Sequence, residues 1–133
     1  MSTTPERLPI KTSGDVVLVR NAVRTAAERI GLRHIDITKL VTAASEIARN
    51  TLIYGGGGTA DVECVEADRR SGVRITFEDH GPGIPDLELA LRPGYTSGSG
   101  LGLGMSGSKK LVDEFEIDSE VARGTRVTMT KWR

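Results

Sequence analysis

The sequence predicts an α/β fold, a two-layer sandwich with a mixed, mainly antiparallel sheet and helices on one face. Two stretches with helical spacing of apolar residues come first, and two pairs of short alternating stretches follow. A polar or glycine-bearing turn joins the members of each pair, as in antiparallel hairpins. Because hairpins rather than single strands alternate with the helices, the doubly wound nucleotide-binding fold is excluded.

Two helices follow a short mixed segment over residues 8–12, which we expect to be a strand. The sequence Ser13-Gly14-Asp15 offers a cap for the first helix, whose apolar residues recur at helical spacing until Gly31 ends it. A second helix begins at Asp36 and keeps the same spacing up to the consecutive glycines Gly55 to Gly58. This second helix is the longest element that the sequence predicts.

The second half of the chain predicts two hairpins separated by an irregular segment. Residues 60–67 and 72–79 alternate between apolar and polar, which indicates strands with one face on the core. Residues 115–121 and 125–132 form the second predicted hairpin, and apolar residues over 105–115 predict a third helix before it. The stretch between the hairpins is rich in proline and glycine, and long irregular segments of this kind are commonly functional.

Length and composition favour one intracellular domain. A chain of 133 residues buries a single core, so we expect one domain over residues 1–133. Lysine plus arginine equals aspartate plus glutamate at 18 each, which disfavours binding to nucleic acid. The single cysteine, Cys64, excludes a disulfide within the chain, and neither His34 nor His80 has a partner at the spacing of a zinc site. No apolar run approaches membrane-spanning length, so we expect no membrane partner and a cytoplasmic location.

Glu46 and Asn50 are the first candidates for chemistry. They lie four residues apart on the second predicted helix, so their side chains project from the same face one turn apart. An amide oxygen is a hard ligand that suits magnesium, and a nearby carboxylate can accept a proton from an attacking hydroxyl. The alternative is a solvated helix face, because both residue types are common on protein surfaces.

The hexapeptide from Asp79 to Ile84 is more informative. Asp79 ends a predicted strand and is followed at once by Gly81 and Gly83, which let a ligand approach the backbone closely. Its carboxylate can accept a hydrogen bond from an exocyclic amine such as that of adenine. A tight turn capped by the aspartate is the alternative.

A glycine-rich run extends from Ser97 to Gly104. It ends where a helix is expected to begin, and the free backbone amides at a helix start bind phosphate well. The strand that a Rossmann fingerprint requires is missing before the run, and no lysine follows at the spacing of a P-loop. A flexible linker is the alternative for the run, and a plain hairpin turn is the alternative for Gly124-Thr125.

In this order and spacing, the motifs together resemble the GHKL ATPase superfamily, named for gyrase, Hsp90, histidine kinases and MutL, over nearly the whole chain. The segment from Glu46 to Asn50 resembles its N box, and the segment from Asp79 to Gly83 resembles its first glycine box. Gly98 to Gly104 resembles the second glycine box, and Gly124-Thr125 resembles the final threonine motif. The fold that this resemblance implies is the Bergerat type of two-layer sandwich.

The resemblance implies a role for each matching residue. Asn50 would hold Mg²⁺, Glu46 would act as the general base, and Asp79 would read the adenine of ATP. Thr125 would support the adenine contact, and Arg49 would be an auxiliary residue for the phosphates or a partner. The other implied ATP-binding residues are Gly81 and Gly83 in the pocket floor, Ile84, and the lid residues Gly98, Ser99, Gly100, Leu101, Gly102, Leu103 and Gly104.

Within the superfamily, the compact length and the segment from Ser45 to Asn50 resemble the switch serine kinases of partner-switching stress signalling. The resemblance implies a kinase that phosphorylates a serine of a STAS-domain protein, often in a stressosome, and then binds a PP2C-type phosphatase or another output protein. Anti-sigma relatives often carry an arginine where this chain has Gly98, which favours the switch-kinase branch. Two alternatives stay open: an anti-sigma factor with serine kinase activity, and a nucleotide-gated activator of a PP2C-type phosphatase with little kinase activity.

Overall fold

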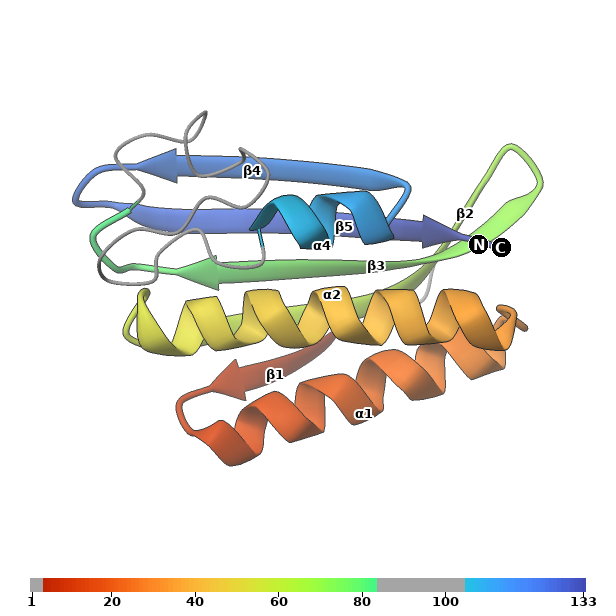
Figure 1. The fold of residues 1–133 in the computed structure, drawn as a ribbon, viewed down its shortest axis with the longest axis horizontal. Helices are drawn as coiled ribbons and strands as arrows, with labels where there is room; N and C mark the ends of the chain where they lie inside the picture. The colour runs from red at the N-terminus through yellow and green to blue at the C-terminus, as the bar shows by residue number, and fades with distance from the viewer. Residues whose placement is uncertain (1–3, 84–104) are drawn as a thin grey trace.

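The computed structural model describes residues 4–83 and 105–133 (Figure 1). Its elements, in chain order, are β1 (Glu6–Ile10), α1 (Ser13–Arg29), α2 (His34–Ile53), β2 (Gly58–Ala67), β3 (Arg70–Asp79), α4 (Met105–Leu111), β4 (Glu114–Glu120) and β5 (Gly124–Trp132). The sheet has the strand order β1-β2-β3-β5-β4, and every pairing between the described strands is antiparallel. The expected two-layer α/β sandwich is confirmed. A mixed sheet would also contain a parallel pairing, and the described strands form none.

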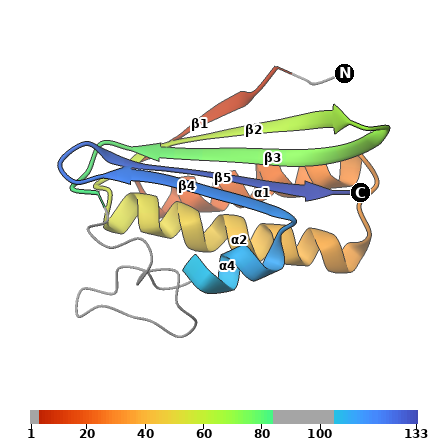
Figure 2. The same cartoon turned by 90° about the horizontal axis from the view of Figure 1, so that it is seen from above.

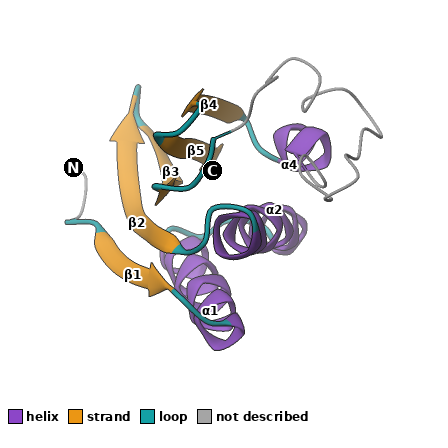
Figure 3. Ribbon diagram, turned by 90° about the vertical axis from the view of Figure 1, so that its left-hand side faces the viewer, coloured by secondary structure: helices purple, strands orange, loops and turns teal. Residues whose placement is uncertain are grey.

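The helices cover one face of the sheet and leave the other face open (Figure 2). α1 and α2 pack side by side against the strands, and α4 lies next to α2 (Figure 3). The core forms between the layers, where the fully buried side chains include Val19, Val23, Leu40, Ile47, Ile75, Phe77 and Met129. In the part of the chain that the structure describes, no helix combines the length and the apolar character needed to cross a membrane.

Helix α1 begins with a capping box whose first residue, Thr12, lies one position before the predicted cap. The Thr12 hydroxyl accepts a hydrogen bond from the backbone N–H of Asp15 at 3.3 Å. The Asp15 carboxylate accepts bonds from the backbone N–H groups of Lys11 at 2.8 Å and Thr12 at 3.0 Å. The bond from Lys11, followed by those from Thr12, lowers the pKa of Asp15 below its ordinary value. The box therefore satisfies backbone donors that a helix start would otherwise leave unpaired.

Helix α2 begins at His34, two residues before the predicted start, and its C-terminal end meets the sheet. The backbone oxygen of Asn50 accepts a hydrogen bond from the N–H of Gly55 at 3.2 Å, which closes the helix. Gly58 starts β2 with no space for a side chain, because a Cβ there would lie 2.0 Å from the carbonyl oxygen of Glu78. The glycines thus let the chain pass directly from the helix into β2 beside the end of β3.

Helix α4 is shorter than the sequence pattern predicted, because Phe115 belongs to β4. The N–H of Asp113 donates to the carbonyl of Thr130 at 3.0 Å, and its carboxylate accepts from the N–H of Trp132 at 2.7 Å. Asp113 therefore fastens the chain to β5 at the point where the helix ends. Along β4, exposed residues alternate with half-buried ones. This period of two is that of a strand, and it takes the place of the helical spacing of α4.

The capping box gives α1 a pH-dependent contribution to stability. Because the folded-state pKa of Asp15 is lowered, its ionised carboxylate stabilises the fold fully at neutral pH, and this stabilisation is lost as the pH falls through the folded-state pKa. We expect Asp15→Asn to lower the free energy of unfolding at pH 7, and the deficit to shrink as the pH is lowered from about 5 to about 3. Urea unfolding followed by circular dichroism measures this, with Glu28→Gln on the same helix as the control. If Asp15→Asn lowered the free energy of unfolding by the same amount at every pH, the proposed role of the Asp15 charge would be contradicted.

Candidate functional site

A pocket opens where the C-terminal end of α2, the end of β3 and the start of β5 meet at one edge of the molecule (Figure 1). Its polar side chains come from Asn50, Thr51, Asp79 and Thr125. Its other lining residues are Ile47, Tyr54, Gly55, Phe77, Gly83 and Val127. Four predicted site residues from three separate parts of the sequence are thus brought together: Asn50, Asp79 with Gly83, and Thr125.

Asp79 is the buried carboxylate of this pocket, with only 8% of its surface exposed. Its Oδ1 accepts hydrogen bonds from the backbone N–H of Gly81 at 2.9 Å and from that of Thr125 at 3.3 Å. Both of these bonds end on the same oxygen, so they fix the orientation of the carboxylate. A carboxylate held in this way can accept a further hydrogen bond from an amine of a ligand.

Glycines surround Asp79 because the backbone passes too close for side chains. A Cβ at Gly55 would lie 2.4 Å from Cγ and 2.5 Å from Oδ2 of Asp79. A Cβ at Gly81 would lie 2.7 Å from the backbone oxygen of Gly55, and one at Gly124, whose φ is +119°, would lie 2.1 Å from the backbone oxygen of Asp79. Gly83 has a φ of +79° and packs in the same manner against the backbone of Glu120. A larger residue at any of these positions would require a shift of the Asp79 side chain or of the backbone around it.

Gly55 is a site residue that the sequence reasoning treated only as a helix terminator. One glycine is enough to end a helix, whereas this chain has four in succession. The glycines beyond the one needed to end the helix were the sequence signal that could have identified Gly55 as a site residue. Gly124 was likewise considered only as part of a turn, although it supports Asp79 from β5.

One stripe of α2 lines the pocket, formed by Ile47, Asn50, Thr51 and Tyr54. Their spacing of three, four and seven residues places them on one helix face. Asn50 is only 9% exposed, and the Thr51 hydroxyl donates to the carbonyl of Ile47 at 3.0 Å. The sequence reasoning identified Asn50 and missed its three neighbours, although their spacing relative to Asn50 could have revealed them.

Thr125 is held from the neighbouring strand by Ser119, its register partner across β4 and β5. The two hydroxyl oxygens lie 2.9 Å apart, within hydrogen-bond distance, and the Ser119 hydroxyl is also 3.2 Å from the carbonyl oxygen of Gly124. The backbone N–H of Thr125 therefore supports Asp79, and the side chain of Thr125 is positioned by Ser119. The sequence analysis had not singled out Ser119, because this pairing is visible only once the strands are in register.

Glu46 does not line the pocket, although it precedes Asn50 by one helical turn. Its Oε1 accepts a hydrogen bond from Nη1 of Arg49 at 3.2 Å, with side-chain exposures of 34% for Glu46 and 53% for Arg49. Glu46 thus lies on the helix next to the pocket, paired with the predicted auxiliary residue. The remaining predicted residues, Ile84 and those from Gly98 to Gly104, lie outside the described residues.

The described part of the chain contains no cluster of three or more histidine, cysteine, aspartate or glutamate side chains that could hold a metal ion. The pocket nevertheless contains a nearly buried amide, Asn50. Magnesium commonly keeps several waters and takes only one or two protein ligands when it is bound together with nucleotide phosphates. A single amide ligand therefore fits magnesium that arrives with a nucleotide.

Residues 11–131 match the family model of the histidine kinase-like ATPase domain. This chain belongs to that family. The ATPase-domain fold expected from the motifs is therefore confirmed, and membership of this family implies that the chain uses a nucleotide.

Relatives of this histidine kinase-like ATPase domain cover most of its length. Serine/threonine-protein kinase RsbT of Bacillus subtilis is 38% identical over 123 residues, which are 92% of each chain. An anti-sigma F factor of Clostridium novyi is 34% identical over 103 residues, 72% of this chain and 71% of the relative. The crystal structure of the RsbU and RsbW domains of a Mycobacterium tuberculosis protein has a TM-score of 0.66 at 27% identity, and the match covers 98% of this chain and 33% of that longer one. These relatives agree with the predicted resemblance to partner-switching kinases.

Gly55→Ala tests whether the carboxylate of Asp79 must stay where the glycine lets it lie. The added methyl group overlaps Asp79, so the carboxylate has to move away from the orientation that the N–H groups of Gly81 and Thr125 give it. Since a hydrogen bond to a charged group contributes about 1.5–3 kcal/mol, we expect ATP to bind about ten to a hundred times more weakly. Calorimetric titration with ATP measures the change. Gly14→Ala is the matched control, because a Cβ there would meet its nearest neighbour at an ordinary 3.6 Å. Unchanged affinity in folded Gly55→Ala would refute this account of the pocket.

Proposed function

We propose that this chain is an ATP-dependent serine protein kinase that phosphorylates a STAS-domain regulatory protein as a partner-switching component of stress signalling in a stressosome. The observation that carries the proposal is the pocket in which Asn50, Asp79 and Thr125 meet, in a chain that aligns with RsbT over 92% of both proteins. In this proposal residues 1–133 form one catalytic domain.

The Asp79 end of the pocket holds adenine in the proposed mechanism. The exocyclic amine of adenine donates a hydrogen bond to the carboxylate, which the backbone N–H groups of Gly81 and Thr125 already orient. The flat base lies between apolar walls that include Phe77 and Val127. Thr125 supports the adenine contact, and Ile84 is a further proposed ATP-binding residue.

Asn50 marks the phosphate end of the pocket. Its amide oxygen would hold Mg²⁺, which would neutralise phosphate charge when bound together with ATP. The lid residues Gly98 to Gly104 bind the phosphates with their backbone N–H groups. Transfer then depends mainly on the alignment of a serine hydroxyl with the γ-phosphoryl group and on charge stabilisation.

Glu46 is the proton acceptor of the proposed reaction. The serine oxygen forms a bond to the γ-phosphorus while the bond from that phosphorus to the bridging oxygen of ADP breaks, and the hydroxyl proton passes to the Glu46 carboxylate. In the structure Arg49 donates to this carboxylate at 3.2 Å. An exposed pair three residues apart on a helix contributes only about 0.3–0.5 kcal/mol, so a docked hydroxyl can displace it. Arg49 is then available to the phosphates or to the protein partner.

Two other functions use the same pocket. An anti-sigma factor with serine kinase activity is favoured by the 34% identity to the anti-sigma F factor of Clostridium novyi. A nucleotide-gated activator of a PP2C-type phosphatase, with little kinase activity, is favoured by the Mycobacterium tuberculosis chain, in which an RsbW domain accompanies an RsbU domain. None of these functions needs a nucleic acid or a membrane, and all belong in the cytoplasm.

Three parallel assays on the purified chain separate the three functions. The purified chain is incubated with γ-labelled ATP, magnesium and a candidate STAS-domain protein, and the label on serine is measured. Serine labelling supports the kinase, and ATP-dependent capture of a purified sigma factor in a parallel sample supports the anti-sigma factor. Activation of a PP2C-type phosphatase without any labelled serine supports the gated activator and overturns the kinase.

Glu46→Gln and Asn50→Asp test the two catalytic assignments. Glu46→Gln should leave ATP affinity unchanged and slow phosphotransfer by about 100-fold or more, since a positioned general base contributes about 10²–10⁴. Asn50→Asp should retain the fold and abolish phosphotransfer, because it changes the proposed magnesium ligand. Glu28→Gln, which neutralises a carboxylate on α1, is the matched control and should transfer phosphate at the wild-type rate. Full activity of both variants, with the fold retained, would rule out the assignments.

A further inference from the structure

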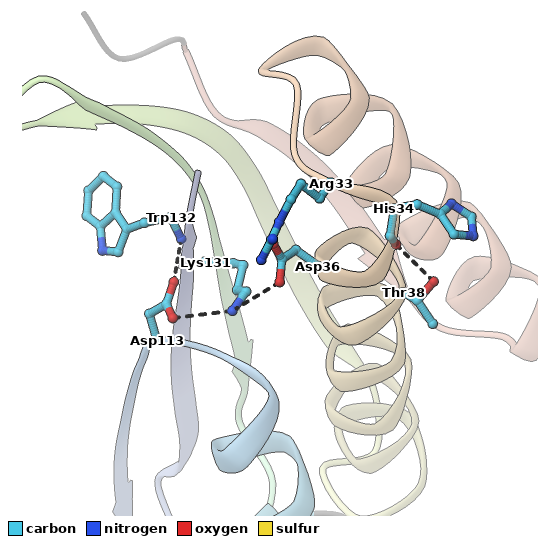
Figure 4. A network of polar contacts seen from close by, with 7 residues as sticks. All are labelled: Arg33, His34, Asp36, Thr38, Asp113, Lys131 and Trp132. Carbon is cyan, nitrogen blue, oxygen red and sulfur yellow. Dashed lines mark hydrogen bonds and ion pairs between the residues drawn. The ribbon is translucent and has the colours of Figure 1, made fainter.

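The end of the molecule opposite the pocket carries a network of polar contacts between α2, β5 and the turn before β4 (Figure 4). The ammonium group of Lys131 lies 3.7 Å from the Asp36 carboxylate and 3.3 Å from that of Asp113. The Arg33 guanidinium is paired with Asp36 at 3.3 Å, and Asp113 also accepts from the N–H of Trp132. Both carboxylates are therefore already engaged within the fold.

A hollow in the surface lies beside this network, and its charges do not balance. Its ionised side chains are four cations, Arg33, Arg70, Lys131 and Arg133, and two anions, Asp36 and Asp113, which leaves a net side-chain charge of +2. Because Arg33 and Lys131 are paired with the two aspartates, the surplus resides on Arg70 and Arg133. Neither of these two arginines has an ion pair among the described residues, and both are exposed.

Arg70 is held in place by an aromatic ring. Its guanidinium carbon lies 5.6 Å from the centre of the Trp132 ring, within the range of a cation–π contact. The ring itself is fixed, because it lies so close to Gly72 that a Cβ there would be 2.7 Å from Cε3. The indole N–H of Trp132 donates to the carboxylate of Glu114. Arg70 thus presents its charge from a rigid support.

Arg133 is positioned by the backbone on the other side of the hollow. Its N–H donates to the carbonyl oxygen of Ser71 at 2.7 Å. Its guanidinium packs on Gly31, where an added Cβ would lie 3.6 Å from Nε and 3.7 Å from Cζ. Arg133 is therefore anchored through its backbone, and Arg70 through its contact with the Trp132 ring, before any partner arrives. Contacts that are already made in the free protein lower the entropy lost on binding.

We propose that this hollow is a docking site for an acidic segment of a protein partner, whose aspartate or glutamate carboxylates bind Arg70 and Arg133. A guanidinium matches the geometry of a carboxylate with two parallel hydrogen bonds, and Trp132 adds apolar surface of the kind enriched at protein interfaces. The chain has no net charge, so the positive surplus is local and does not form the extended basic surface typical of nucleic-acid binding. This inference does not rest on the proposed phosphotransfer.

Binding of an end-capped, fluorescein-labelled octaglutamate peptide to the full chain tests the proposal. Fluorescence anisotropy gives the affinity, and unlabelled peptide should change the fluorescence of Trp132, the only tryptophan of the chain. We expect the double variant Arg70→Gln, Arg133→Gln to bind the peptide about ten times more weakly or worse, because two charge-assisted contacts are lost. Affinity should also fall as salt is raised.

Arg20→Gln is the matched control, since Arg20 is an exposed arginine of α1 away from the hollow. It should bind the peptide as the wild type does, and all variants should bind ATP with the wild-type affinity, which shows that they are folded. The proposal is overturned if the wild type does not bind at low salt, or if the double variant binds equally well. It is also overturned if Arg20→Gln loses as much affinity as the double variant, or if a single-stranded oligonucleotide binds more tightly through the same two arginines.

Discussion

The pocket depends on one buried carboxylate that is shared between two strands. Asp79 is 8% exposed at the end of β3, and one of the two N–H groups on its Oδ1 belongs to Thr125 at the start of β5. A buried carboxylate without such donors would be costly, because its charge would lose the hydrogen bonds of water. The same contact that satisfies the charge therefore holds the ends of β3 and β5 together, and it gives the pocket an acceptor of fixed direction.

The glycines around Asp79 are explained by the close approach of the backbone to this carboxylate, and not by a need for a flexible chain. Gly55, Gly81 and Gly124 come from three different segments, and each lies where a Cβ would overlap Asp79 or the backbone that supports it. The C-terminal end of α2 can therefore reach the sheet, and Asn50 is carried to the same pocket by the helix. The absence of a side chain at one position in each of three segments thus shapes the site. Its chemistry comes from only a few polar groups.

Most of the fold and the main polar residues of the site could be predicted from the sequence, because both leave local signals. Helical and alternating spacing predicted the elements, and the motifs predicted Asn50, Asp79, Gly83 and Thr125 among the residues that line the pocket. Gly55 and Ser119 were missed because their roles are contacts with residues distant in the chain, Asp79 for one and the strand register for the other. The end of α4 was missed for a similar reason, since the bonds of Asp113 to β5 override the helical spacing.

The position of Asn50 over the pocket also depends on the opposite end of the molecule. Lys131, next to the last residue of β5, pairs with Asp36 at the start of α2. With side-chain exposures of 13% and 14%, this pair is better shielded from water than a surface ion pair. From Asp36 the helix extends about 21 Å to Asn50, at 1.5 Å per residue. α2 is thus fastened to β5 at one end by an ion pair and to β3 at the other by close glycine contacts. The hollow beside Lys131 and the pocket beside Asn50 share no lining residue, so the proposed acidic partner and the proposed nucleotide would not compete for the same side chains.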